Sequence, residues 1–155
     1  MTQATAELGR QPLIRLIAKM MLPFIFVFGL YVILHGEVGP GGGFQGGVIL
    51  AAGFILYGLV FGAAQLRERV PPVVFDVGMA LGALIYSGTG LACIWFGGTF
   101  LDYGMLQATH AGDGEALGMT LVEYGVGITV CSVMVQIYLI VGDRGPDRSH
   151  GKEVG

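Results

Sequence analysis

The chain has 155 residues, of which 54% are hydrophobic and only 12% are charged, and its formal net charge is −3. A soluble domain carries about a quarter charged residues, so this composition indicates a single membrane domain and gives no reason to expect a nucleic-acid partner. Cys93 and Cys131 lie in apolar stretches without the spacing of metal ligands. No disulfide framework, zinc site or cofactor is therefore expected.

Four apolar stretches are each long enough to cross a hydrocarbon core, which takes about 20 residues in a helix. A spanning segment must satisfy its own backbone hydrogen bonds in lipid, so the sequence predicts an all-α integral membrane protein with four transmembrane helices in antiparallel hairpins. The membrane domain, 13–142, lies between an N-terminal segment, 1–12, and a tail, 143–155. Its predicted spans cover about residues 13–34, 44–64, 73–97 and 117–142.

The basic residues predict the orientation of these helices. Loops 35–43 and 98–116 contain no lysine or arginine, so with four spans every basic residue falls on one side of the membrane. The positive-inside rule makes that side cytoplasmic, and it places both termini in the cytoplasm. The residues on which this prediction depends are Arg10, Arg15, Lys19, Arg67, Arg69, Arg144, Arg148 and Lys152.

His35 closes the first predicted helix at the outer surface, and the glycine-rich run HGEVGPGGGFQGG, residues 35–47, begins with it. The histidine is either a proton relay, given an ordinary pKa of ~6.5, or a polar helix end bonded to the backbone. A phosphate-binding loop of the Walker type needs a lysine after its glycines. Residues 39–47 contain neither lysine nor arginine, so phosphate binding is excluded.

The same run is interpreted as a stiff external turn that leads into the second helix. Pro40 fixes one φ angle of the turn, and glycine lets the backbone fold back and lets another helix lie close. Phe44 and Gln45 are the only side chains left to reach out, Phe44 to line a gap and Gln45 to bind a cation or water. The glycines assigned to this motif and to helix packing are Gly41, Gly42, Gly43, Gly46 and Gly47.

The short link at 65–72 predicts a tight antiparallel hairpin between the second and third helices. Pairs of glycines at GxxxG spacing, Gly58 with Gly62 and Gly78 with Gly82, let helices approach closely in lipid. Their packing partner is either this chain or another subunit. The outer loop that follows is expected to form a short surface helix around 100–106.

Asp76 and Glu123 are the only two carboxylates within the predicted spans. Their positions in the third and fourth helices place them ~16 Å apart in depth, too far for a direct pair. Asp76 is either an interfacial residue bonded to loop amides, Arg67 or Arg69, or part of an ion path. Glu123 is more deeply buried, and Thr120 and Gly127 on its face leave room for water, so a role in a proton or cation path is weighed against structural pairing.

The stretch LHGEVGPGGGFQGG, between two apolar helices, resembles the B subunit (the MnhB/MrpB family) of the multisubunit Mrp-type sodium/proton antiporters. The resemblance covers residues 12–142, and PGGGFQGG is its most specific part. It implies a non-enzymatic subunit of a hetero-oligomer that exchanges Na+ for H+ across a bacterial or archaeal cytoplasmic membrane. Other membrane subunits of the antiporter and the lipid bilayer are its implied partners.

In such complexes larger subunits carry the proton-conducting lysines and glutamates, and Lys19, at the membrane edge, is the only lysine near a span here. The resemblance therefore implies a role in assembly or in one wall of the ion path. Similar subunits occur in redox-driven complexes such as membrane-bound hydrogenases, and that host is the first alternative. A purely structural scaffold is the second, and an independent homodimeric transporter is the third.

Overall fold

The computed structural model describes residues 12–36, 41–106 and 111–143. This part of the chain is helical and has no strand, which confirms the predicted all-α class. Four of its helices are long and apolar enough to cross a membrane, as expected of a multi-pass membrane protein. The helices are α2 (Pro12–Leu34), α3 (Gly43–Phe61), α4 (Ala63–Arg69), α5 (Pro72–Trp95) and α6 (Ala111–Asp143), with a 3-10 helix at Tyr103–Leu106.

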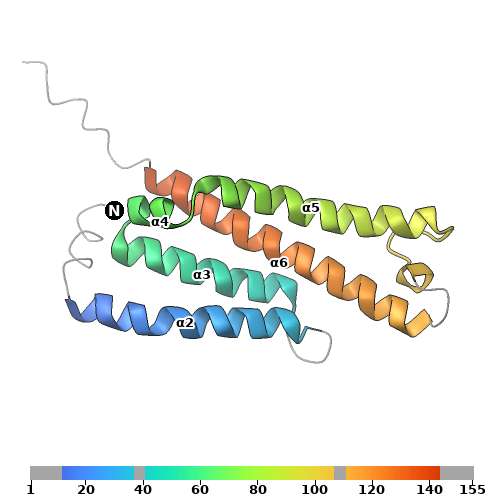
Figure 1. Cartoon of the computed structure of the whole chain (residues 1–155), viewed down its shortest axis with the longest axis horizontal. Helices are drawn as coiled ribbons and strands as arrows, with labels where there is room; N and C mark the ends of the chain where they lie inside the picture. The colour runs from blue at the N-terminus through green and yellow to red at the C-terminus, as the bar shows by residue number, and fades with distance from the viewer. Residues whose placement is uncertain (1–11, 37–40, 107–110, 144–155) are drawn as a thin grey trace, which may run out of the picture.

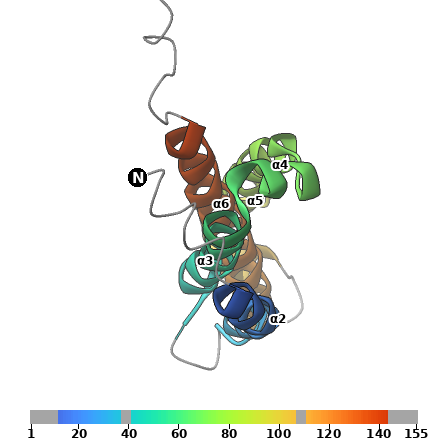
Figure 2. The ribbon, with the colours of Figure 1, turned by 90° about the vertical axis from the view of Figure 1, so that its left-hand side faces the viewer.

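The four long helices form a single row rather than a closed bundle. Figure 1 shows them in the order α2, α3, α6, α5, and each helix packs extensively only on its neighbours in this row. Within the row α2 and α3 are antiparallel, as are α5 and α6, whereas α3 and α6 run in the same direction. The end-on view in Figure 2 shows that α6 runs obliquely, because its two ends lie far apart in that view.

The predicted tight hairpin of the second and third helices is wrong. Between them α4 forms as a separate short helix after a bend at Gly62. The φ of Gly62 is 107°, a value that residues with a side chain rarely adopt. This bend directs α5 away from α3, and α6 lies between the two over most of their length. Although the link between α3 and α5 is short, both helices pack extensively on α6 rather than on each other.

Two helix boundaries also differ from those expected. Helix α3 ends at Phe61 rather than 64, because the bend at Gly62 interrupts it. Helix α6 begins at Ala111, six residues before the predicted start at 117, because the helix continues beyond the apolar run into a polar turn. In the outer loop, the expected short helix is the 3-10 helix at Tyr103–Leu106.

A small core lies where α3, α4, α5 and α6 meet. The ring of Phe54 contacts the ring of Phe26 on α2 at 4.9 Å between centroids and the ring of Phe75 on α5 at 5.6 Å, so it joins three helices of the row. Both cysteines are buried free thiols. The buried residues of this core are Ala51, Leu66, Phe75, Cys131, Val135 and Leu139.

Helix α5 packs on α6 through its GxxxG pair, so these glycines serve packing within the chain. A β-carbon on Gly78 would overlap the hydroxyl of Ser132 and would lie 3.3 Å from the Ser132 Cβ. We expect Gly78→Ala to lower the free energy of unfolding by about 1 kcal/mol, since overpacking costs about 2 kcal/mol and the gain in helix propensity returns about 1 kcal/mol. The thermal midpoint of the purified chain in detergent, followed by circular dichroism, measures this loss.

The clash at Gly78 involves a removable oxygen, so a second substitution tests its cause. In the double variant Gly78→Ala/Ser132→Ala the overlapping hydroxyl is gone, and the thermal midpoint is expected to return most of the way to that of Ser132→Ala alone. A double variant as unstable as Gly78→Ala would show that the hydroxyl is not the obstacle.

Candidate functional site

The glycine motif forms the beginning of α3 and its contact with two neighbouring helices. Gly42 precedes the helix with a φ of 149°, which favours glycine. Gly46 faces α2, where a β-carbon would lie 2.8 Å from the backbone oxygen of Gly29. Gly43 and Gly47 face α6. The beginning of α3 is therefore held between α2 and α6 by backbone contacts that only glycine permits.

Glu123 of α6 lies directly against this motif. Its backbone oxygen occupies the position that a β-carbon on Gly43 would take, and its carboxylate occupies the space beside Gly36 and Gly42. One turn further along α6, Gly127 packs on Gly43 and Gly47. The motif and the buried carboxylate, singled out separately in the sequence, are thus parts of one site.

The described lysine and arginine residues lie far from Glu123. Arg15 and Lys19 lie near the beginning of α2, and Arg67 and Arg69 lie on α4. Figure 1 places both of these segments at the opposite end of the row from the turn between α2 and α3. Among the described residues, His35, just after α2, is the one basic side chain at the same end of the row as Glu123. A half-buried carboxylate in a membrane span needs a polar group, a cation or water beside it.

The face of Glu123 is more closely packed than the sequence suggested. The predicted space for water beside Thr120 and Gly127 is reduced, because Gly127 packs on α3 and the Thr120 hydroxyl donates a hydrogen bond to the Ala116 carbonyl at 2.8 Å. The carboxylate itself fills the space that Gly36 and Gly42 leave free of side chains.

The other candidates near the motif lie on its exposed side. Phe44 is 63% exposed, and Gln45 is exposed beside Gly41, where a β-carbon would lie 3.6 Å from the Gln45 Oε1. His35 is exposed at the end of α2, with its backbone amide bonded to the Tyr31 carbonyl and its ring stacked on the Tyr31 ring at 4.2 Å. Pro40 lies outside the described residues.

Asp76 belongs to a separate polar pair at the other end of the row. Its Oδ1 accepts a hydrogen bond from Nε2 of Gln136 on α6 at 3.0 Å. Gln136 is thirteen residues beyond Glu123, or about 20 Å along the helix, so the two carboxylates do not share a site. Asp76 is exposed, and Ala80, Ala83 and Ser87 continue an exposed small-residue face of α5.

Two contributors to these sites were missed in the sequence. Gln136 interrupts the apolar run VMVQIYLIV, and an amide in such a run is a signal for a polar partner in the membrane. Gly36 lies within the glycine-rich run, residues 35–47, but was not singled out there, and only the position of Glu123 shows its use. Among the described residues, no group of three or more histidine, cysteine, aspartate or glutamate side chains is placed to hold a metal ion.

Comparison with known proteins gives a consistent result. The sequence model of a family described as a domain related to the MnhB subunit of Na+/H+ antiporter matches residues 13–136. A protein of Staphylococcus haemolyticus (strain JCSC1435), named as a proposed antiporter subunit, mnhB2, is 34% identical over 128 residues, which cover 81% of this chain and 90% of the relative. Proteins of the same name from Staphylococcus aureus strains MRSA252 and Newman are 34% and 33% identical over the same shares.

Proposed function

Because this chain belongs to the family of domains related to the MnhB subunit of Na+/H+ antiporters, we propose that it is a small integral-membrane subunit of a multisubunit, Mrp-type Na+/H+ antiporter. The relatives are named as antiporter subunits, which favours this host over a redox-driven complex such as a hydrogenase. The distribution of basic residues supports a position in the cytoplasmic membrane with both termini in the cytoplasm.

Within the complex, the chain lines one wall of the ion path with Glu123. The observation that carries this role is the half-buried carboxylate in the space beside Gly36 and Gly42, far from the described lysine and arginine residues. A carboxylate there accepts a proton or stabilises a passing cation, and the glycines keep bulky side chains out of its way. Phe44 and Gln45, exposed at the same turn, face either a partner subunit or the continuation of the path.

The chain also supports assembly of the antiporter. Its row of helices exposes large apolar side chains on α2, α3, α5 and α6, and this surface is available to lipid and to the other membrane subunits. The exposed small-residue face of α5 from Asp76 to Ser87 suits close contact with a helix of a partner.

Glu123→Gln tests the role in the ion path. The amide has the shape of the carboxylate but neither takes up and releases a proton nor stabilises a cation as a carboxylate does, so Na+/H+ exchange is expected to fall about tenfold or more. Exchange is measured as a sodium-dependent change of the pH gradient in everted vesicles that contain the whole complex. Co-purification of the other subunits with a tagged copy shows whether the complex still assembles.

Glu115→Gln is the matched control, because Glu115 is an exposed residue of the same helix, two turns earlier. It makes the same chemical change outside the glycine motif and is expected to leave exchange intact. If Glu123→Gln supports normal exchange in an assembled complex, the chain is a structural scaffold and not part of the path.

A further inference from the structure

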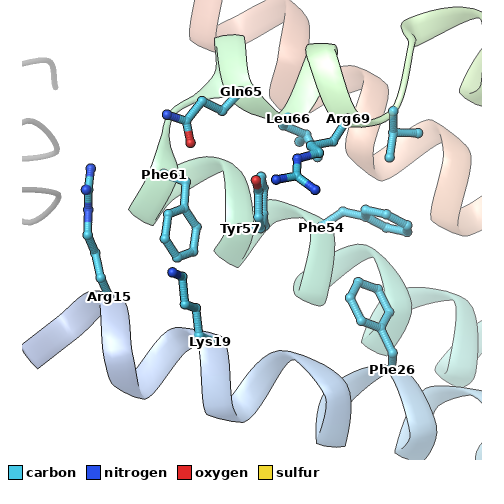
Figure 3. Close-up of a pocket in the computed structure, with 10 residues that line it drawn as sticks. Arg15, Lys19, Phe26, Phe54, Tyr57, Phe61, Gln65, Leu66 and Arg69 are labelled. Atoms are coloured by element: carbon cyan, nitrogen blue, oxygen red, sulfur yellow. The ribbon is translucent and has the colours of Figure 1, made fainter. Parts of the chain in front are cut away.

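A cavity of about 460 Å³ lies between α2 and the bend that joins α3 to α4, at the end of the row opposite the glycine motif. Figure 3 shows that α2 supplies one side of it and that α3 and α4 supply the other. The helices of the row are held together by contacts elsewhere, and the cavity is separate from the site at Glu123. Its lining therefore calls for a separate explanation.

Three basic side chains line the cavity, Arg15 and Lys19 near Phe61 and Arg69 beside Tyr57. Arg15 and Lys19 reach into it from α2, and Arg69 reaches in from α4, where Gln65 adds an amide. The Arg15 Cζ and the Lys19 Nζ lie 5.8 Å and 5.9 Å from the centroid of the Phe61 ring. Among the described residues, no acidic side chain lines the cavity, so its three positive charges favour an anion.

The rest of the lining is mainly apolar and aromatic. Phe61, Tyr57 and Phe54 follow one another along one side of α3, and the ring of Phe26 contacts that of Phe54 at the far end of the cavity. Phe61 and Phe54 are two turns apart, or about 10 Å along the helix. An anion alone would leave this aromatic wall without a ligand, whereas a phosphate ester with a hydrocarbon tail would contact both parts.

We propose that this cavity binds one anionic phospholipid. Its phosphate lies between Arg15 and Lys19 on α2 and Arg69 on α4, and one acyl chain follows the aromatic wall from Tyr57 toward Phe54. The location suits this ligand, because the basic ends of membrane helices face the leaflet that carries anionic lipids, and basic pockets between helices bind their head groups. The tail of the lipid also fills the gap that the bend at Gly62 leaves between α2 and α4.

Native mass spectrometry of the purified full-length chain in a neutral detergent tests this inference. The probes are dioleoyl phosphatidylglycerol, dioleoyl phosphatidylcholine with the same acyl chains, and inorganic phosphate. One molecule of phosphatidylglycerol is expected to remain bound, whereas phosphatidylcholine and phosphate dissociate. In Lys19→Gln/Arg69→Gln the affinity for phosphatidylglycerol is expected to fall about 30-fold, since each basic residue near an anionic lipid contributes about a factor of five.

Two controls separate a specific site from general attraction and from misfolding. Arg148→Gln/Lys152→Gln removes the same two charges outside the described residues and is expected to keep the affinity of the wild type. Arg69→Lys keeps the charge in the cavity and is expected to retain most of the binding. Equal losses in both double variants, equal retention of the two lipids, or competition by inorganic phosphate at the same concentration would each overturn the proposal.

The assembled complex provides a further test, since an acidic segment of a partner subunit is the competing occupant. A photo-crosslinking benzoylphenylalanine in place of Tyr57 is expected to label phospholipid in membranes that contain the whole complex. Labelling of another subunit instead would assign the cavity to a protein contact and contradict lipid binding.

Discussion

Replacing Gly43 with alanine is expected to separate α3 from α6 and to prevent the subunit from entering its complex. The added β-carbon would coincide with the backbone oxygen of Glu123 and would lie 3.0 Å from its Cα. A backbone carbonyl within a helix cannot rotate away, so the whole of α3 must shift. The cost of about 3 kcal/mol or more exceeds the gain in helix propensity of about 1 kcal/mol.

The loss is measured as the amount of tagged subunit in the membrane and as the fraction of the other subunits that co-purify with it. Gly88→Ala is the matched control, because a β-carbon on Gly88 of α5 meets no atom within 4 Å. It is expected to leave both quantities unchanged or slightly raised. Normal assembly of the Gly43→Ala variant would contradict the close contact of the two helices.

Gly82→Ala is expected to open the contact between α5 and α6. Its β-carbon would overlap the Thr129 hydroxyl and would lie 2.5 Å from the Gly125 backbone oxygen and 2.9 Å from the Thr129 amide nitrogen. Unlike the clash at Gly78, this one involves backbone atoms, so shortening a side chain of α6 does not relieve it. The two helices must therefore move apart.

The buried thiols report this opening. Cys93 on α5 is fully buried and Cys131 on α6 is 9% exposed, so both react slowly with a maleimide in the folded chain. In Gly82→Ala the rate of alkylation in detergent is expected to rise about tenfold or more, as local opening becomes easier by about 1.4 kcal/mol. Gly88→Ala should react at the rate of the wild type, and equal rates in all three proteins would refute the prediction.

The number and type of the long helices could be predicted from the sequence, but their order in the row could not. Apolar runs of sufficient length require helices in lipid, which is why α2, α3, α5 and α6 lie close to the predicted ranges. Which helices pack together depends on small complementary surfaces on both helices, and these are hard to identify in the sequence. The short link between α3 and α5 suggested that these two helices form a hairpin. The positive φ of Gly62 and the independent helix α4 overturn that inference, and neither has a clear signal in the sequence.

The site was only partly predictable for a related reason. Glu123 stood out because a carboxylate in an apolar span is rare, and the glycine run stood out by composition. Their contact depends on two parallel helices in register, with Gly43 and Gly47 on one and Glu123 and Gly127 on the other. Both pairs have the same four-residue spacing, and that match is the one feature of the sequence that indicates the contact.

The contact of α3 with α6 also has a mechanical consequence. Side chains between two helices act as compliant spacers, since a change of rotamer absorbs a small displacement. At Gly43, Gly47 and Gly127 there are no such side chains, and the backbone of α3 contacts the backbone of α6 directly. A displacement of the beginning of α3 is therefore transmitted directly to the peptide unit of Glu123, so these two segments move together.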